Sequence, residues 1–392
     1  MRFFGIDVGS QSHVVAMVDE DLHILLKPTS FGEDAAGYDK LRTLLGEVTD
    51  CLVVMEATGH YRWNLHRTLA GWGFTISVVN PLRTRRFAEE DLRRAKTDSI
   101  DALGIARFAA LKRPTPTAPL DEVAEQLREL VRLRLRLVQH LGDRQRQLHR
   151  LLDLCFPEFT RHVRDLDTDL ARGILREFPT AQAIGDCTLR RLARHRCGRR
   201  TVGTTLARNL IEAAQASVGR HQAEVYGRQV RFLCEDAGTL ANENEIRNLD
   251  SEIQARARKH ELALLLTTID GVGLLTAAHI VAEVGDPAAF RCAAALAAYV
   301  GVTPGTKQSG RWQPQKARLS MIGNARLRRA LWMPTLTAVR CNPWLAAHYQ
   351  RLREKGKPPK VALIAAMRKL LTAVYSVAKN RKPFAHHAAS KS

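Results

Sequence analysis

The stretch Phe3–Gly9 (FFGIDVG) decides the fold, because it predicts a short, buried first strand that carries an acid and stops at a glycine. Further strands are expected at residues 13–18 and 22–27, separated by the polar turn at residues 19–21. Three strands joined this closely form an antiparallel meander. A helical pattern at roughly residues 33–45 follows the third strand.

Continuously apolar strands come next and alternate with helices. Residues 51–56 (CLVVME) and 74–79 (FTISVV) are predicted to be buried strands, and residues 61–69 between them have a helical pattern. A strand–helix–strand unit with continuously apolar strands implies a parallel crossover. The order of elements therefore predicts an α/β domain with a mixed sheet of the RNase H type.

Four acids are expected at one edge of this sheet. Asp7 ends the first strand and Glu56 ends the strand that should lie beside it, where ligands of such sheets gather. The segment Lys96–Asp101 (KTDSID) starts a helix after the last strand, with Thr97 as its cap. Within it, Asp98 and Asp101 are three residues apart, so both carboxylates can aim at one point.

Converging carboxylates are costly unless a cation lies between them, and all-oxygen sites suit Mg²⁺ or Mn²⁺. Taken alone, Asp98 and Asp101 are also explained as an acidic first turn that favours the positive end of a helix. The two acids at strand ends favour the metal site. We therefore predict that Asp7, Glu56, Asp98 and Asp101 bind Mg²⁺ or Mn²⁺.

Basic residues are concentrated in the last quarter of the chain. Residues 305–392 hold nineteen Lys or Arg and one acid, Glu354, and so carry +18 of the formal net charge of +20. This balance points to a phosphate backbone as the partner, with an anionic membrane as the weaker option.

A membrane span, a signal peptide and a disulfide framework are not expected. Apolar runs such as Val361–Met367 are too short to cross a bilayer, and the chain begins directly with a strand. The seven cysteines are odd in number and include no close pair, which argues against disulfides and a zinc site. These features favour a reducing compartment, the cytoplasm.

The middle of the chain predicts a helical arm. Residues 112–119 contain three prolines and are expected to be a linker. Residues 121–154 form a long charged helix with leucines at near-heptad spacing, and residues 243–266 form a second, antiparallel one, so that the pair serves dimerisation. Between them, residues 155–230 are helical but irregular, and their Arg-rich pieces are either nucleic-acid contacts or ordinary solvated faces.

The basic end predicts a helical domain with nucleic-acid contacts. Residues 268–277 have the form of a helix-hairpin-helix turn, and residues 301–311 are a Gly- and Pro-bearing loop that contains Ser309. A serine in a loop is normally a turn former. We predict domains at residues 1–111, 112–265 and 266–392. The expected nucleic-acid contacts are Lys96, Lys307, Arg311, Lys316, Arg318, Arg326, Arg328, Arg329, Lys357 and Lys360.

Short motifs in both halves of the chain carry a family resemblance. They cover about residues 1–155 and 265–384, and their joint occurrence in order is highly specific. The motifs are Asp7, Glu56 with Thr58-Gly59, Asn80-Pro81, Lys96-Thr97-Asp98, Asp101, Ile269-Asp270-Gly271-Val272-Gly273, Gly285-Asp286, Phe290, Gln308-Ser309-Gly310, Gly323-Asn324, Leu327-Arg328 and Lys369-Leu370-Leu371. With these motifs, the chain resembles the DEDD transposases of the insertion-sequence family that includes the Piv-type DNA invertases.

The resemblance implies a RuvC-like N-terminal domain, a coiled coil, and a C-terminal transposase domain in which Ser309 matches the nucleophilic serine. It also implies a homotetramer, a dimer of dimers, that binds DNA at an element end and a target in a bacterial, nucleoid-associated setting. Several members are guided by a structured noncoding bridge RNA. This chain departs from the family at Asp270, where proline is usual, and in a longer segment at residues 156–260.

These features predict a DNA transposase or recombinase. A serine hydroxyl is a poor nucleophile unless it is activated, and Mg²⁺ at the four acids would neutralise charge at the scissile phosphate. Ser309 would then form a covalent serine–DNA link that a second strand's hydroxyl resolves. The main alternative is a metal-dependent nuclease of the Holliday-junction resolvase type, in which water attacks and Ser309 is only a loop residue. A nucleic-acid-binding module with a vestigial fold is the third possibility.

Overall fold

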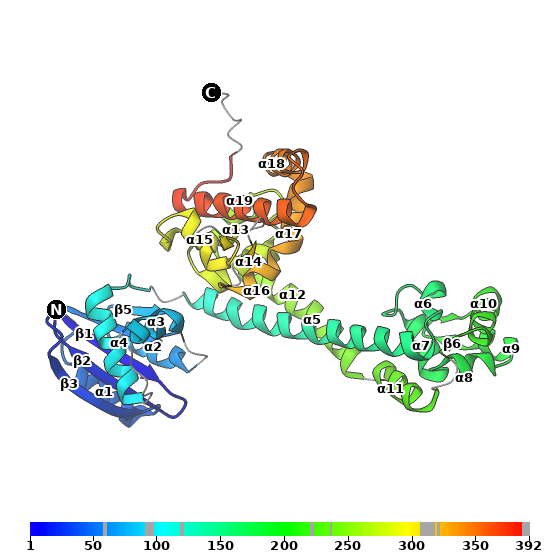
Figure 1. Cartoon of the computed structure of the whole chain (residues 1–392), viewed down its shortest axis with the longest axis horizontal. Coiled ribbons are helices and arrows are strands. Elements are labelled where there is room, and N and C mark those ends of the chain that lie inside the picture. The colour runs from blue at the N-terminus through cyan, green and yellow to red at the C-terminus, as the bar shows by residue number, and fades with distance from the viewer. Residues whose placement is uncertain are drawn as a thin grey trace, which may run out of the picture. The chain divides into compact units, whose positions relative to one another are not determined.

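The computed structural model describes residues 1–57, 61–90, 98–117, 121–219, 223–235, 237–305, 318–319 and 322–385 (Figure 1). Within these ranges, the backbone alone is described at residues 90, 98–100, 223, 237–243, 304–305 and 318. The chain divides into two compact units, Met1–Asp121 and Glu122–Ser392. Each unit is described by itself below.

The first unit contains the predicted mixed sheet, with strand order β3-β2-β1-β4-β5. β1 pairs antiparallel with β2 and parallel with β4, and β4 pairs parallel with β5, which confirms the predicted meander and crossover. The third strand starts later than predicted, because Leu22 adopts a φ of 68° and belongs to the turn. The strands are β1 (Arg2–Val8), β2 (Ser12–Val18), β3 (Ile24–Gly32), β4 (Cys51–Glu56) and β5 (Ile76–Val79).

Helices cover both faces of the sheet, and alternate residues of each strand point to opposite faces. On one face, Phe4 and Ile6 of β1 pack with helices α1 (Ala35–Leu45) and α2 (Arg62–Gly71). On the other face, Phe3 of β1 and residues 52 and 54 of β4 pack with α4 (Asp98–Lys112). Helix α3 (Pro81–Glu90) contacts α4 through Phe87, whose ring packs edge-on against Phe108.

The proline-rich stretch expected to be a linker lies along the sheet edge instead. Thr117 N–H donates to the Ile76 carbonyl at 2.7 Å, and Ser77 Oγ donates to the Thr115 carbonyl at 2.9 Å. Pro114 is buried. Proline lacks a backbone donor, so an edge position of this kind is where a sheet tolerates it.

The second unit is mostly helical and is organised around α5 (Glu122–Cys155) and α12 (Ala237–Ala257). The two helices run antiparallel, because Gln126 contacts Arg256 while Arg134 binds Asp250. The prediction of one helix over residues 243–266 is wrong. The His260 ring accepts a hydrogen bond from Ala263 N–H and caps a separate helix, α13 (Glu261–Leu266).

Between α5 and α12 lies an inserted subdomain, residues 155–235 (Figure 1). Its hydrophobic core also includes Leu148, Leu151 and Leu152 from the last turns of α5. Phe156, Phe159, Ile174 and Leu210 are completely buried in it. Its short elements are α6 (Phe159–His162), α7 (Asp169–Glu177), α8 (Ala181–Gly185), α9 (Leu189–Arg194), β6 (Arg196–Cys197), β7 (Arg200–Thr201), α10 (Thr204–Gln215) and α11 (Ala223–Glu235).

The C-terminal helices pack around α19 (Pro359–Asn380). By length and composition α19 would be able to cross a membrane, but 56% of that stretch is buried inside the protein, as in a core helix. Met367 and Leu370 are fully buried. The other elements are α14 (Leu274–Val284), η1 (Pro287–Ala289), α15 (Ala293–Val300), β8 (Pro304–Gly305), β9 (Arg318–Leu319), α16 (Ala325–Ala330), α17 (Trp332–Cys341) and α18 (Pro343–Glu354).

The contact between β1 and α4 gives a first prediction. A Cβ atom on Gly5 would lie 2.2 Å from the Ala106 nitrogen and 2.3 Å from the Ala102 oxygen, both backbone atoms that cannot move without the helix. Gly5→Ala should therefore destabilise the first unit by about 1–3 kcal/mol, the usual cost of overpacking. Hydrogen exchange of β1 and α4 amides in the full chain measures the effect.

Gly104→Ala in α4 is the matched control, because nothing lies within 4 Å of a Cβ atom there. It should be neutral or stabilising by up to about 1 kcal/mol, since alanine has the higher helix propensity. Equal exchange protection in the two variants would contradict the close packing of α4 on β1.

Candidate active site

Asp7 and Glu56 are neighbours at the carboxyl ends of two parallel strands. Ile6 is paired with Met55 in the register of β1 and β4, so the next residues along, Asp7 and Glu56, lie side by side. By alternation, Asp7 shares the face of Phe3, which packs with α4, and Glu56 shares the face of Val54. Both acids are half-buried on the face that α4 covers.

Helix α4 runs antiparallel to β1, and this direction brings its N-terminus to the Asp7 end of the strand. Arg113, just after α4, lies over the ring of Phe3 with its Cζ 5.7 Å from the centroid. Further along β1, Gly5 meets the backbone of Ala102 and Ala106. The helix therefore passes Phe3 with its last residues and Gly5 with its middle, so its first turn points towards Asp7.

Asp101 and Asp98 belong to this first turn. Asp101 is half-buried and directly precedes Ala102, and Asp98 is the first residue of α4, one turn earlier. The side chain of Asp98, like Lys96, Thr97 and Thr58-Gly59, lies outside the described part of the chain. The structure thus places Asp7, Glu56 and Asp101 at one edge and on one face of the sheet.

A buried threonine, which sequence reasoning missed, orients Glu56. Thr84 of α3 is 6% exposed, and its hydroxyl lies 2.5 Å from Glu56 Oε1, to which it donates. The Asn80-Pro81 motif explains its position, because Asn80 Oδ1 accepts from Leu82 N–H at 2.9 Å and starts the helix. A hydroxyl three residues after that motif was the signal available in the sequence.

The donor set fits Mg²⁺ or Mn²⁺, because Asp7, Glu56 and Asp101 offer only carboxylate oxygens. Hydrogen bonding of a ligand carboxylate to a residue behind it is also usual in metal sites, and Thr84 supplies that bond. The three described carboxylates do not all lie within 4.8 Å of one another. Closure around an ion therefore depends on Asp98 or on small side-chain rotations.

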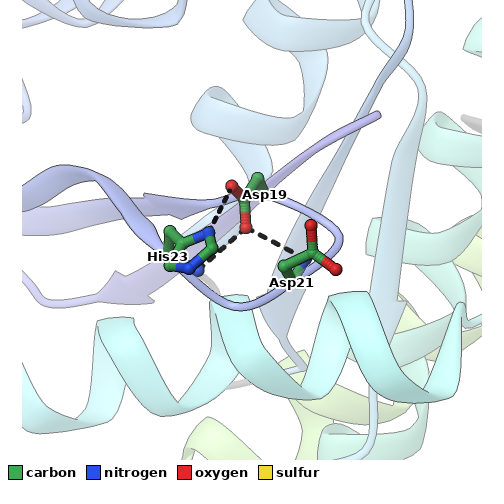
Figure 2. A group of neighbouring side chains, drawn as sticks. All are labelled: Asp19, Asp21 and His23. Carbon is green, nitrogen blue, oxygen red and sulfur yellow. Dashed lines mark hydrogen bonds and ion pairs between the residues drawn. The ribbon is translucent and has the colours of Figure 1, made fainter.

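A second group of metal-ligating side chains, Asp19, Asp21 and His23, lies within that spacing (Figure 2). It forms the turn between β2 and β3, where Asp19 accepts from the backbone N–H of Asp21 at 3.0 Å and of His23 at 2.8 Å. The group is at the opposite end of the sheet from Asp7, because Val18 pairs with Phe3. Its contacts are those of a turn.

Ser309 lies outside the described residues, as do Lys307, Arg311 and Lys316, but the base of their segment is described. Strands β8 and β9 pair antiparallel, Pro304 with Leu319 and Gly305 with Arg318. Residues 305 and 318, which flank residues 306–317 in the sequence, therefore lie side by side. The side chain of Arg318 is outside the described part.

Two glycines bring the ends of this segment together. Gly323 has a φ of 140°, and a Cβ atom there would lie 2.6 Å from the Gly301 nitrogen. Gly301 has a φ of 80° and ends α15 in the left-handed conformation, which favours glycine. Asn324 N–H then donates to the Tyr299 carbonyl at 2.7 Å. This bond joins the residues that follow the Ser309 segment to those that precede it.

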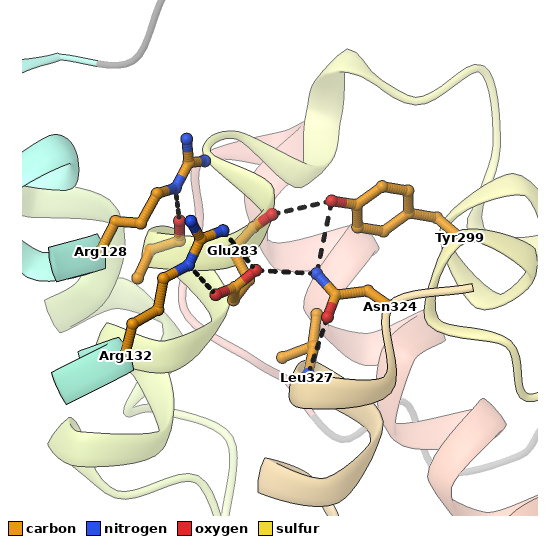
Figure 3. Close-up of polar contacts among 7 residues, drawn as sticks. Arg128, Arg132, Glu283, Tyr299, Asn324 and Leu327 are labelled. Carbon is orange, nitrogen blue, oxygen red and sulfur yellow. Dashed lines mark hydrogen bonds and ion pairs between the residues drawn. The ribbon is translucent and has the colours of Figure 1, made fainter. Parts of the chain in front are cut away.

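A buried carboxylate, Glu283 of α14, fixes this base to the long helix α5 (Figure 3). Arg132 of α5 binds both of its oxygens, at 2.8 and 3.2 Å. The Asn324 amide donates to Glu283 Oε2 at 2.9 Å, and Tyr299 donates to the Glu283 carbonyl at 3.0 Å. Arg128 adds a bond from α5 to the Ala282 carbonyl at 2.6 Å.

The charge state of Glu283 follows from these contacts. Burial by itself raises the pKa of this carboxyl, but hydrogen bonding and charge from Arg132, together with the Asn324 amide, outweigh burial and hold the pKa below its ordinary value. Burial lowers the pKa of Arg132, and Glu283 more than compensates, so that pKa is raised. Both directions favour the charged pair.

The basic residues expected to contact nucleic acid divide into two groups. Arg326, Lys357 and Lys360 are exposed, and Arg329 is exposed while its Nη1 donates to Gln139 of α5 at 3.3 Å. Arg328 is instead half-buried and donates to the Val300 carbonyl at 3.0 Å, beside Gly301. Arg328 therefore supports the base of the Ser309 segment.

The predicted helix-hairpin-helix turn also has a packing role. Gly271 has a φ of 94°, and a Cβ atom there would lie 2.5 Å from the Ala338 Cβ of α17. Gly273 precedes α14 and has nothing within 4 Å of such an atom. Packing against α17 thus explains Gly271, whereas the space beside Gly273 is open.

Two family models match the chain on either side of the inserted subdomain. Residues 4–157 match a DEDD model described as a transposase, and residues 263–350 match one described as "Transposase IS116/IS110/IS902 family". The first match spans Asp7, Glu56, Asp98 and Asp101, and the second spans Glu283 and Ser309.

Curated relatives extend this similarity over most of the chain. A Streptomyces coelicolor protein named "Mini-circle putative transposase for IS117" is 30% identical over 378 residues, 90% of this chain and 88% of the relative. An IS116 protein of Streptomyces clavuligerus is 27% identical, with 97% and 95% covered. The pilin gene-inverting protein of Moraxella bovis is 26% identical, with 85% and 81% covered.

Thr84 gives a prediction that does not depend on activity. Thr84→Val keeps the shape of the side chain but removes the bond to Glu56. The affinity for Mn²⁺, measured by titration with electron paramagnetic resonance, should fall about 10- to 100-fold, as for other residues behind metal ligands. Thr84→Ser retains the hydroxyl and should bind as the wild type does. Wild-type affinity in Thr84→Val would refute this role.

Glu283 gives a prediction with a pH dependence. Glu283→Gln leaves Arg132 without its partner and should cost about 3 kcal/mol at neutral pH in urea unfolding. Because the folded pKa is below the ordinary value of 4.5, the stabilisation is complete above that pH and is lost as pH falls through the folded pKa. The difference in the free energy of unfolding between wild type and variant should therefore become smaller as the pH falls below 4.5.

Asp143→Asn is the control for Glu283→Gln, because Asp143 pairs with Arg146 on the surface of α5. An exposed pair contributes about 0–1 kcal/mol, so this variant should unfold almost as the wild type does. The assigned charge state of Glu283 would be contradicted if the difference in unfolding free energy between wild type and Glu283→Gln stayed constant or grew on acidification.

Proposed function

The chain belongs to the IS116/IS110/IS902 family of transposases, and from this premise we propose that it cuts and rejoins insertion-sequence DNA through a covalent serine–DNA intermediate. As a transposase it is an enzyme that acts on DNA. The observation that supports its metal-assisted step is the arrangement of Asp7, Glu56 and Asp101 at one sheet edge, on the face covered by α4, and Ser309 is taken from its sequence motif.

The four acids Asp7, Glu56, Asp98 and Asp101 would hold Mg²⁺ or Mn²⁺. Bound there, the ion would neutralise charge on the scissile phosphate during in-line attack. Thr84 keeps Glu56 oriented, and Gly5 keeps the first turn of α4 near the strand ends. These residues preorganise the site before DNA arrives.

Ser309 would be the nucleophile. Its Oγ forms a bond to phosphorus while one phosphate–oxygen bond of the DNA strand breaks, and the departing strand oxygen takes up a proton. A hydroxyl of a second strand then attacks the same phosphorus and releases the serine. One phosphodiester is exchanged for another at each step, so no ATP is needed. Lys307 and Arg311 flank Ser309 in the sequence and would bind the same phosphate.

The partners follow from the same premise. DNA at an element end and at a target would lie on the basic C-terminal residues, among them Arg326, Lys357 and Lys360. The acids and Ser309 belong to different compact units, so they can come from different subunits of a homo-oligomer, a dimer of dimers. We further propose a structured noncoding bridge RNA as guide, and a bacterial cytoplasmic, nucleoid-associated setting.

A metal-dependent nuclease of the Holliday-junction resolvase type is the second candidate. One observation favours it: the acids lie in a unit with its own sheet and core, which needs no residue from the Ser309 segment to direct a water at a phosphate. In this case Ser309 is only a loop residue. A binding module without metal-dependent chemistry is the remaining outcome.

Trapping of the intermediate decides between these functions. The full chain is incubated with end-labelled element DNA and Mg²⁺, denatured, and separated by electrophoresis. A protein–DNA adduct is expected in the wild type and in the control Ser320→Ala, and it should be absent in Ser309→Ala. Cleavage that survives Ser309→Ala would establish the nuclease, and no metal-dependent reaction in any variant would leave the binding module.

Asp98→Asn separates the acids from the DNA-binding surface. The variant should lose all metal-dependent reaction while its salt-sensitive affinity for DNA stays at the wild-type level, because phosphate contacts are made by basic residues elsewhere. Filter binding at several salt concentrations measures this. A parallel collapse of affinity would contradict the separation.

A further inference from the structure

The inserted subdomain presents a dense group of arginines. Residues 187–211 contain seven arginines and no acid. Six of the arginines lie on α9 and on the β6–β7 hairpin, and all six are exposed. We call this group the arginine hairpin surface. Its members are Arg190, Arg191, Arg194, Arg196, Arg199 and Arg200.

Apolar anchors hold this surface in a defined shape. Leu192 of α9 is completely buried, and Cys197 of β6 is 2% exposed against Gly173, where a Cβ atom would lie 2.7 Å from its Sγ. His195 Nε2 donates to the Gly173 carbonyl at 3.0 Å. The elements that carry the arginines are therefore fixed to α7, and the charge is presented on a rigid scaffold.

Among the described residues, one of the six arginines has a carboxylate partner. Arg191 binds Glu177 at 2.9 Å and lies over the ring of Phe178. In the part of the chain that the structure describes, the other five have no carboxylate partner. By contrast, Arg132 and Arg134 on α5 are both paired. Clustered charge of one sign repels itself, so an anionic partner would stabilise this surface.

The chemistry of the surface favours the backbone of a duplex. Residues 187–203 contain no Phe, Tyr or Trp, so they offer no aromatic platform on which unpaired bases could stack. They also include no exposed large apolar side chain among the described residues, which an anionic membrane surface would engage. Arginine forks match phosphate oxygens, and the family acts on DNA.

We propose that the inserted subdomain binds the phosphate backbone of duplex DNA through the arginine hairpin surface. The contact lies away from the described base of the Ser309 segment. Arg329 of α16 touches α5 at Gln139, and α5 continues to Cys155, a rise of ~24 Å at 1.5 Å per residue. The subdomain would therefore hold flanking DNA about seven base pairs or more from the exchange point. Neither Ser309 nor the four acids is needed for this binding.

The test compares two triple variants of the full chain that each remove three positive charges from the inserted subdomain. Affinity for a 60-base-pair duplex of arbitrary sequence is measured by fluorescence anisotropy over a range of salt, with a hairpin RNA of equal charge as the second probe. The hairpin variant is Arg196→Gln, Arg199→Gln, Arg200→Gln; the control is Arg161→Gln, Arg164→Gln, Arg228→Gln, all exposed positions.

In the hairpin variant, the slope of log affinity against log salt for DNA should become shallower by about two to three, since each lost phosphate contact contributes about 0.9. The control should keep the wild-type slope. A third variant with lysine at residues 196, 199 and 200 should restore most of the slope, which shows that folding is intact.

Three results would overturn the proposal. Equal slopes in the hairpin variant and the wild type would show that the surface makes no contact with DNA. An equal loss in the control would show a bulk effect of net charge. A loss confined to the RNA probe would assign the surface to RNA. Because no cleavage is measured, these outcomes are independent of the proposed serine chemistry.

Discussion

The close approach of α4 to β1 at Gly5 is the constraint on which the first unit depends. A helix normally rests on a sheet through side chains on both elements, but here the strand contributes no side chain and the helix contributes alanines. Phe3 and Phe108 fill the space on one side of this contact. This contact fixes the direction of α4 along β1 and its distance from the sheet. The acidic first turn of α4 therefore lies at the end of β1 that carries Asp7.

The second unit uses a buried charge for a similar purpose. Glu283 joins three parts of the chain that are far apart in sequence, the arm at Arg132, the end of α15 at Tyr299 and the start of α16 at Asn324. An apolar side chain would fill the same space, but it would make no hydrogen bonds that orient these three parts of the chain. A carboxylate with several donors specifies the geometry of the described residues that flank the Ser309 segment, and Arg328 and the two glycines support that geometry.

Much of the sheet and part of the site were predictable, because they follow from local patterns. Alternating and continuous apolar runs gave the strand order, and that order placed Asp7 beside Glu56. The role of Thr84 was not predictable in the same way, because it depends on a hydrogen bond between α3 and the end of β4. The helix break at His260 depends on one local cap inside an otherwise continuous pattern. Ser309 stays a sequence prediction.

The inserted subdomain shows a different limit. Its helices are short, between four and thirteen residues, so none has a periodic pattern long enough to reveal its buried side. Phe156 and Phe159 lie in the region predicted to be helical but irregular, and both are completely buried. The sequence alone does not distinguish the exposed arginines from an ordinary solvated face. The buried core does, because it shows that these arginines are held on a fixed scaffold, as a binding surface requires.

We propose that the sheet edge at β1 and β4 and the first turn of α4 form one metal site. Anomalous diffraction from crystals of the full chain soaked in Mn²⁺ tests it most directly. One strong peak is expected at bonding distance, about 2.2 Å, from carboxylate oxygens of Asp7, Glu56 and the acids of α4. A peak at Asp19, Asp21 and His23 with none at the strand ends would contradict it.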